Sequence, residues 1–346
     1  MSLSGGNASD DEFEQYDAYI DMFLPGDWET ILRYYIIPVV VAFGIVGNIM
    51  TFIVIVSKLR NAVYVYLANL AIADTMSLIV GPFFDLKLIS VPYTIYDIDG
   101  NNLNCELATG YFTSVAWHVA ILTIFWLSIE RYMAVCRPYW FQRSGFGTLS
   151  RSVKICAIVW IFCLSGNVVQ FVIAYERVYV ILPWPDMYRG VSNRETMCQF
   201  NEAYIEISTI LWTTQFVLNI LGNVIIAVLC FLMVYSLRKS QNVVKNSCKT
   251  NQGSKPERKI FCTVFVTVTV YVLCLTPLNV IIMCFLLDSI GTDLNWLVTV
   301  CRFGSLFNSS VNPLIYNVVN ETFRQAFVDV FYRTMRRKLA ARTVSV

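Results

Sequence analysis

Charged side chains are scarce in this chain of 346 residues, where Asp, Glu, Lys and Arg make up 14% against about 25% in ordinary soluble proteins. Histidine is nearly absent: His118 stands alone and is expected to pack in the core, and no zinc-ligand motif or pair of catalytic carboxylates occurs. Hydrophobic residues reach 56%, so the composition indicates a membrane protein. Because those catalytic motifs do not occur, we expect the chain not to be an enzyme. A formal net charge of +2 gives no support for a nucleic-acid partner.

Seven apolar segments are each long enough to cross a bilayer, which takes about 20 helical residues. They are residues 34–57, 63–88, 105–136, 153–174, 204–237, 260–287 and 294–318. We therefore predict an all-α membrane protein with a bundle of seven transmembrane helices over residues 34–318. An odd number of spans places the two ends of the chain on opposite sides of the membrane.

The basic residues predict the orientation of these spans. If the N-terminus lies outside, 20 of the 26 Lys and Arg residues fall on the cytoplasmic side, which is the usual bias of membrane proteins. Residues 1–33 then form an acidic extracellular tail with a glycosylation sequon at Asn7. This tail either solubilises the chain or attracts a basic ligand. The prediction is a multi-pass protein of the plasma membrane with its N-terminus outside.

The third span carries an informative motif at its inner end. From Cys105 to Arg131 are 26 residues, about 39 Å of helix, which is enough to place the cysteine at one face of the bilayer and the arginine at the other. The tripeptide Glu130-Arg131-Tyr132 resembles the inner end of the third helix of rhodopsin-like (class A) G-protein-coupled receptors. Further motifs of this family recur in order, namely Gly47-Asn48, Leu70–Asp74, Trp160, Cys274–Pro277 and Asn312–Tyr316.

The sequence also departs from the family pattern. Ala120 stands where a serine is usual, and Leu275 replaces a tryptophan. Span five lacks the family's proline, because none occurs between Pro185 and Pro256. Span seven has no lysine to hold retinal, so an opsin is not indicated. The resemblance covers about residues 34–331.

The resemblance implies a mechanism and partners. It implies a receptor that catalyses nucleotide exchange on heterotrimeric G proteins through outward movement of helix 6, with arrestin as a further partner. At rest, Arg131 is expected to pair with Glu130 and Glu257. The residues assigned to coupling and switching are Glu130, Arg131, Tyr132, Glu257, Pro277, Asn312, Pro313 and Tyr316. The family's outer disulfide is expected between Cys105 and Cys198, the two of eleven cysteines that fall near the predicted outer surface.

Asp74 lies deep in span two, where a carboxylate must be hydrogen-bonded, protonated or paired. In the family this position binds sodium as an allosteric modulator, and the resemblance implies Asn308, Ser309 and Asn312 as further ligands. The missing serine at Ala120 weakens that prediction. The alternative is a protonated, hydrogen-bonded Asp74 without sodium, and no other cofactor is predicted.

The predicted ligand is a neuropeptide. Pro82, the long outer segment 175–203 and the pattern of residues 320–327 resemble receptors of the neuromedin-U and thyrotropin-releasing-hormone type. The candidate ligand-binding residues are Asp85, Phe112, Thr113 and Arg302. Arg302 is expected either to pair with Asp85 or to meet an acidic or carbonyl group of the ligand. The alternatives are a rhodopsin-like receptor for a non-peptide small molecule and a seven-helix transporter, although no inverted repeat is visible.

Residues 319–346 are expected to form an eighth helix and a short basic cytoplasmic tail. Phe323, Phe327 and Phe331 recur at a spacing of four, which gives one apolar helix face. Such a helix lies on the membrane surface with its apolar face in contact with lipid.

Overall fold

The structure is a computed structural model of the chain, and it describes residues 14–15, 28, 31–85, 101–172, 175–181, 194–200, 205–246, 255–286 and 295–333. Side chains are described over a smaller part, chiefly residues 31–82, 110–168, 206–239, 262–284 and 296–332. Asn7, with its predicted sequon, lies outside the described residues.

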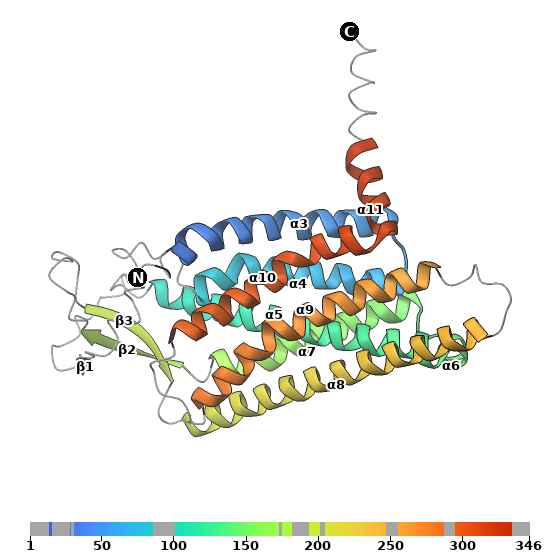
Figure 1. Cartoon of the computed structure of the whole chain (residues 1–346). Helices are drawn as coiled ribbons and strands as arrows, with labels where there is room; N and C mark the ends of the chain where they lie inside the picture. The colour runs from blue at the N-terminus through green and yellow to red at the C-terminus, as the bar shows by residue number, and fades with distance from the viewer. Residues whose placement is uncertain are drawn as a thin grey trace, which may run out of the picture.

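Seven long helices run side by side in the described part of the chain (Figure 1). They are α3 (Ile37–Lys58, preceded by the π-helical turn η3, Leu32–Ile36), α4 (Ala62–Asp85), α5 (Asn101–Cys136), α7 (Leu149–Val172), α8 (Ile205–Asn246), α9 (Lys255–Leu286) and α10 (Asn295–Val319). α5 occupies the centre and contacts α4, α7, α8 and α9. The predicted seven-helix bundle is confirmed.

Six of these helices are apolar and long enough to cross a membrane. Within the described residues the candidate spans are Leu32–Lys58, Ala62–Pro82, Gly110–Cys136, Leu149–Val168, Thr209–Ser236 and Cys262–Cys284. Their outer faces are apolar, with Val39, Phe162 and Phe231 exposed by 70%, 66% and 68%. α10 has 25 residues but a more polar sequence, and it packs against α3, α4 and α9. The chain is therefore a multi-pass membrane protein whose seventh helix is largely surrounded by protein.

α8 and α9 are longer than predicted. α8 continues to Asn246 instead of ending near residue 237, and α9 begins at Lys255 instead of residue 260. The prediction marked only the apolar stretch that crosses hydrocarbon. The extra turns contain Arg, Lys, Gln and Glu, which favour helix in water as well.

Two short helices lie at one end of the bundle, called here the α6 end. α6 (Pro138–Ser144) begins with proline and ends at Gly145, whose φ of 62° is the left-handed conformation that favours glycine. In α11 (Glu321–Val328), Asn320 accepts a hydrogen bond from the backbone N–H of Phe323 at 3.2 Å and so caps the helix. A π-helical segment, η7 (Asp329–Arg333), follows, so a helix is present where the eighth one was predicted.

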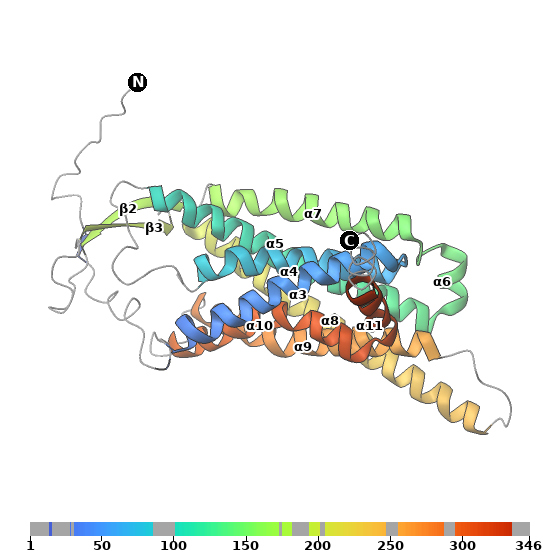
Figure 2. The same cartoon turned by 90° about the horizontal axis from the view of Figure 1, so that it is seen from above.

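A β-hairpin lies at the opposite end, called here the hairpin end (Figures 1 and 2). β2 (Tyr175–Ile181) pairs antiparallel with β3 (Arg194–Phe200), and β1 (Glu14–Gln15) adds to β2 in parallel. The sequence analysis treated this segment as a loop, and the structure forms a hairpin here, whereas the predicted all-α bundle is confirmed. The overlooked signal is the run of Tyr, Val and Ile in β2, which favours a strand.

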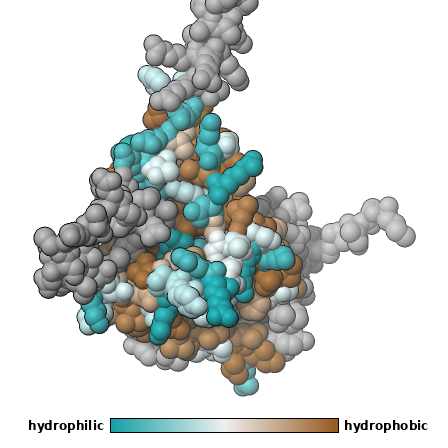
Figure 3. Space-filling view, turned by 90° about the vertical axis from the view of Figure 1, so that its right-hand side faces the viewer, coloured by the Kyte–Doolittle hydropathy of each residue, from teal (hydrophilic) through white to brown (hydrophobic). Residues whose placement is uncertain are grey.

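Hydrophilic residues gather over the α6 end, which faces the viewer in Figure 3. The exposed basic residues near this end include Lys58, Arg60, Arg137, Arg143, Arg151, Lys154, Arg238, Lys239 and Arg324. Positive charge next to a membrane span favours the cytoplasmic side. This distribution agrees with an inner α6 end, although the orientation stays a prediction.

The hairpin end bears on the predicted disulfide. β3, which contains Cys198, contacts α5, whose first turns contain Cys105, but both cysteine side chains lie outside the described part. We expect peptide mapping without reductant to recover the two residues in one cross-linked fragment. Cys198→Ser should lower the melting temperature, because such a bridge contributes about 2–4 kcal/mol. Cys136→Ser, at a free cysteine, is the control. Two free thiols at Cys105 and Cys198 in active protein would contradict the prediction.

Candidate functional site

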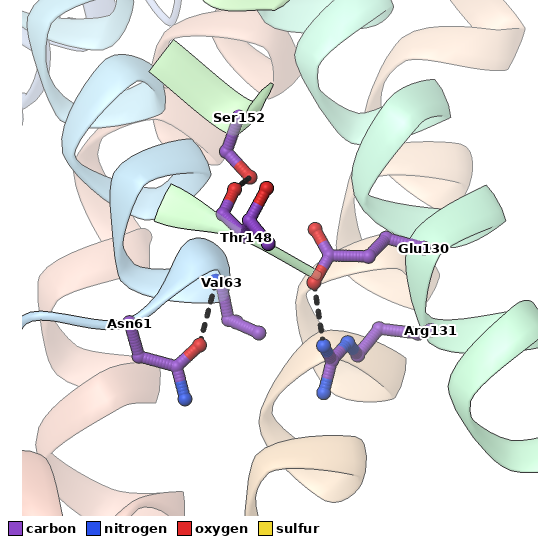
Figure 4. A network of polar contacts seen from close by, with 6 residues as sticks. All are labelled: Asn61, Val63, Glu130, Arg131, Thr148 and Ser152. Atoms are coloured by element: carbon purple, nitrogen blue, oxygen red, sulfur yellow. Dashed lines mark hydrogen bonds and ion pairs between the residues drawn. The ribbon is translucent and has the colours of Figure 1, made fainter. Parts of the chain in front are cut away.

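An ion pair lies at the α6 end of α5. Nη2 of Arg131 is 2.7 Å from Oε1 of Glu130, and the side chains of these residues are 13% and 0% exposed. Figure 4 shows both side chains facing the first turns of α4 and α7. A buried carboxylate is costly without a partner, so the adjacent guanidinium offsets part of the cost of burying Glu130.

The first turns of α4 and α7 are fixed by local hydrogen bonds beside this pair (Figure 4). Asn61 accepts from the backbone N–H of Val63 at 3.2 Å, and Ser152 donates to the carbonyl of Thr148 at 3.3 Å. Among the described residues, Oε2 of Glu130 and Nε of Arg131 have no hydrogen-bond partner. The pair can therefore accept further partners.

The expected third member of this arrangement is Glu257. It belongs to α9, which contacts α5, but its side chain lies outside the described part. Tyr132 is half-buried next to Arg131. The pairing of Arg131 with Glu257 therefore stays a prediction.

Pro313 in α10 frees a backbone carbonyl that another helix then uses. Proline has no N–H, so the carbonyl of Ser309, four residues earlier, loses its helical partner. Asn48 of α3 donates to this carbonyl at 2.8 Å and to the carbonyl of Gly44 at 3.0 Å. The asparagine of span one and the proline of span seven thus belong to one contact.

Asp74 of α4 is also tied to α10. It is 1% exposed, and its Oδ2 accepts a hydrogen bond from Nδ2 of Asn312 at 2.8 Å. Asn308 precedes Asn312 by one helical turn and is 3% exposed. The Oδ1 atoms of Asp74, Asn308 and Asn312 have no hydrogen-bond partner among the described residues.

These buried oxygen atoms fit a hard cation, which prefers oxygen ligands. Ser309 is also buried, whereas Ala120 offers no side-chain oxygen. Among the described residues, no group of three or more His, Cys, Asp or Glu side chains could hold a metal ion. A cation here would therefore depend on one carboxylate and on neutral oxygens, which suits a monovalent ion.

The switch residues of α10 connect to α11 at the α6 end. Tyr316 is 1% exposed, and its ring packs edge-on against Phe323 of α11 with centroids 5.8 Å apart. Asn320 donates to the hydroxyl of Tyr64 in α4 at 3.3 Å. Movement of this part of α10 would therefore change contacts with both α4 and α11.

In α9, Pro277 lies beside a polar contact with α8. Asn223 of α8 donates to Oγ1 of Thr276 at 3.3 Å. Leu275, which replaces the usual tryptophan, is 2% exposed. On the α10 side, a Cβ at Gly304 would lie 3.3 Å from the carbonyl oxygen of Cys274, so the two backbones approach closely there. α9 is thus held from both sides next to its proline.

The predicted ligand residues lie toward the hairpin end and are only partly brought together. Thr113 is 8% exposed, and its Oγ1 has no partner among the described residues. Phe112 is 42% exposed and packs edge-on against Tyr111 at 5.2 Å. Arg302 is half-buried in α10, whereas the side chain of Asp85 lies outside the described part. The pairing of Arg302 with Asp85 stays a prediction.

Polar contacts between helices reveal two residues that the sequence analysis missed, Asn69 and Thr123, in a network with Trp160, which it had named. Trp160 of α7 donates to Oδ1 of Asn69 at 2.8 Å, and Asn69 donates to Thr123 of α5 at 2.7 Å. This network joins α4, α5 and α7. His118 was expected in the core, but it lines a cavity and contacts the side-chain amide of Gln215 in α8.

The sequence matches the family described as "7 transmembrane receptor (rhodopsin family)" over residues 47–316, which is more than half of the chain. The chain belongs to this family. Neuromedin-U receptor 2 of Rattus norvegicus is 27% identical over 320 residues, 87% of this chain and 76% of the relative. Its counterpart in Mus musculus is 26% identical over 337 residues, 92% of this chain and 79% of the relative. The expected likeness to neuromedin-U receptors is confirmed.

A third relative is the melatonin receptor type 1A of Ovis aries. It is 25% identical over 313 residues, 86% of this chain and 77% of the relative. These relatives are receptors, and a receptor of the rhodopsin family acts on its G protein and not as an ordinary enzyme. The Glu130–Arg131 pair, the Asp74–Asn312 contact and the proline inside α10, Pro313, are therefore found here in a rhodopsin-family receptor.

Proposed function

We propose that this receptor binds a neuropeptide at the hairpin end and catalyses nucleotide exchange on a heterotrimeric G protein at the α6 end. The α6 end would then lie in the cytoplasm and the acidic N-terminal tail outside the cell. The observation that carries the proposal is the buried Glu130–Arg131 pair at the basic end of a rhodopsin-family bundle. A charge pair held beneath a protein-binding face can be exchanged for contacts with a partner.

The proposed mechanism is a shift between two states of α9. At rest, Glu130 and Glu257 both hold Arg131, so α9 stays close to α5. Ligand at the hairpin end favours the state in which α9 moves outward and Arg131 is released. A ligand can shift this equilibrium only by its difference in affinity for the two states. Arrestin would recognise the same opened face.

The ligand is proposed to be a peptide because two of the relatives are neuromedin-U receptors. The hydroxyl of Thr113 has no hydrogen-bond partner within the part of the chain that the structure describes. Arg302 has a planar guanidinium suited to a carboxylate or carbonyl group. The acidic tail would attract a basic peptide. The melatonin receptor among the relatives supports a second candidate, a small neutral ligand.

One experiment compares the two candidates. Receptor purified in lipid discs is mixed with G-protein heterotrimers, and the binding of a GTP analogue is timed with a library of amidated peptides and, in parallel, with indoleamides. Acceleration by peptides alone supports the proposal. Acceleration by indoleamides alone supports the second candidate. Solute uptake into vesicles without any nucleotide exchange would overturn both.

Arg302 gives a sharper prediction about the ligand. It lies 11 residues before Pro313, about 16 Å along α10 toward the hairpin end. If it pairs with Asp85, exchanging the two residues in Asp85→Arg/Arg302→Asp should restore part of the potency that each single change removes. If Arg302 contacts the ligand, the double variant should not regain potency. The potency of Arg302 variants should then fall only for peptides that retain the contacted group. Near-normal potency of Arg302→Ala would contradict both readings.

We also propose that sodium binds beside Asp74, with oxygen atoms of Asn308, Ser309 and Asn312. Since the ion would stabilise the resting arrangement of α4 and α10, replacing choline chloride by sodium chloride should weaken agonist binding. Asp74→Asn should remove this effect. An unchanged salt response in Asp74→Asn, measured at equal ionic strength, would exclude the site.

A further inference from the structure

A cavity of about 650 Å³ lies between α5, α7 and α8, away from the ligand residues named above. α5 packs against both α7 and α8 (Figure 1). Residues of all three helices line the cavity. Phe162 of α7 and Leu218 of α8 line it and are 66% and 61% exposed, so it opens on the lipid-facing surface. Its volume falls within the range of about 300–1,000 Å³ that is usual for small-molecule sites.

Two glycines keep this cavity open. Gly166 of α7 and Gly222 of α8 line it, and a Cβ built on either residue would meet no atom within 4 Å. Glycine weakens a helix interior, and at Gly304 a close backbone approach explains it. No such approach exists at Gly166 or Gly222 among the described residues. A side chain at either position would instead fill the cavity.

Polar side chains converge on the same cavity. His118 of α5 lies 3.4 Å from Nδ2 of Asn167 in α7, and this Nδ2 also donates to the carbonyl of Cys163 at 2.7 Å. Asn167 and Asn219 are 5% and 7% exposed. Oδ1 of Asn167 and Nδ2 of Asn219 have no hydrogen-bond partner among the described residues. One is an acceptor and the other a donor, and hydrocarbon cannot satisfy either.

We propose that this cavity binds an uncharged lipid alcohol that enters from the bilayer. A hydroxyl group can donate to Oδ1 of Asn167 and accept from Nδ2 of Asn219, while an apolar body lies against residues such as Leu122, Phe125 and Leu218. A charged headgroup does not suit the site, because the described lining residues include no Asp, Glu, Lys or Arg.

The cavity lies next to contacts that join α8 to α5 and α9, so a molecule bound in it can affect the proposed movement of α9. Asn219 lies one turn before Asn223, whose amide donates to Thr276 beside the proline of α9. Phe216, six residues before Gly222 on α8, packs against Trp117 of α5 with ring centroids 6.3 Å apart. A bound alcohol therefore fixes α8 relative to both α5 and α9. This regulatory effect rests on the proposed function, whereas binding does not.

The test uses the purified full-length receptor in lipid discs without G protein. A photoreactive sterol with a free hydroxyl and a photoreactive monoacylglycerol are the two probes, and labelled peptides are mapped by mass spectrometry. At least one probe should label α7 or α8 beside the cavity. Its methyl ether, which cannot donate a hydrogen bond, should compete about tenfold less well, equivalent to about 1.4 kcal/mol.

Variants distinguish this site from general contact with lipid. Gly222→Leu and Gly166→Leu should abolish labelling, and Asn219→Leu should weaken it about tenfold. Ala157→Leu on α7 and Ala227→Leu on α8 are matched controls, because both alanines are exposed and lie outside the cavity. If a glycine variant fails to fold, labelling of Asn219→Leu and competition by the methyl ether still test the site.

The proposal is overturned if neither probe labels the cavity, or if labelling is the same in every variant and with the methyl ether. Nucleotide exchange is then measured separately with the probe that binds. Labelling as expected in a protein that never activates a G protein would leave the site standing and refute the proposed function. Agonist-driven nucleotide exchange without labelling of the cavity would support the proposed function and overturn the lipid site.

Discussion

Arg131→Ala is expected to abolish G-protein activation at saturating agonist, while agonist still binds at the hairpin end. Arg131 lies at the basic α6 end and pairs with Glu130, and in the proposed mechanism it is the cation that is released to meet the G protein. Nucleotide exchange and radioligand binding are measured on the same membranes. Arg143→Ala removes one exposed positive charge from α6 and is the matched control, with activation retained.

Misfolding has to be separated from loss of coupling in this experiment. Arg131→Ala leaves the fully buried Glu130 without its cation, and breaking such a pair costs about 3–5 kcal/mol. The double variant Glu130→Gln/Arg131→Ala removes both charges and should fold better, yet still fail to activate. Normal activation by the double variant would show that Arg131 has no part in coupling.

Glu257→Ala tests whether Glu257 holds Arg131 in the resting state. If Glu257 helps to hold Arg131, its loss should raise nucleotide exchange without agonist, because the resting state loses stability relative to the open one. Glu206→Ala, which removes an exposed acid from the first turn of α8, is the control. Basal exchange that equals the parent value at matched surface expression would contradict the role of Glu257.

The sequence predicts the number and the order of the helices well, but not their rotation about their own axes. Residues 312 and 74 were placed in one site by resemblance, and the structure joins their side chains at 2.8 Å. The bond from Asn48 to the carbonyl of Ser309 was not foreseen. In a membrane helix, the faces toward lipid and toward protein are both apolar, so apolar periodicity does not reveal which face turns inward.

In α8, the spacing of polar residues indicates which face of the helix turns inward. Without a proline its register could not be assigned, yet Gln215, Asn219 and Asn223 recur every four residues in an otherwise apolar helix, on one face. The structure turns Gln215 and Asn219 toward the cavity and Asn223 toward α9. The hairpin was missed for a different reason, because its strands were treated only as the connection between two spans.

Gly44→Ala is expected to destabilise the helix bundle. Among the described glycines of the transmembrane helices, replacement by alanine should have its largest effect at Gly44. A Cβ at this position would lie 2.8 Å from Cα of Ser310 in α10 and 2.7 Å from Cδ1 of Leu78 in α4. The leucine side chain can turn away, but the backbone at Ser310 cannot move unless α10 shifts as a whole. Overpacking of this kind costs about 1–3 kcal/mol.

The melting temperature in detergent measures this effect, and Gly166→Ala is the matched control because its added methyl group would meet no atom within 4 Å. The control should melt at the parent temperature or slightly above it, since alanine favours helix over glycine. Gly44→Ala should melt lower, and Gly44→Val lower still. Because Asn48 donates to the carbonyls of both Gly44 and Ser309, a shifted α10 should also weaken the contact that satisfies the carbonyl freed by Pro313. Equal melting of Gly44→Ala and the parent protein would mean that α3 and α10 are not in close contact at Gly44.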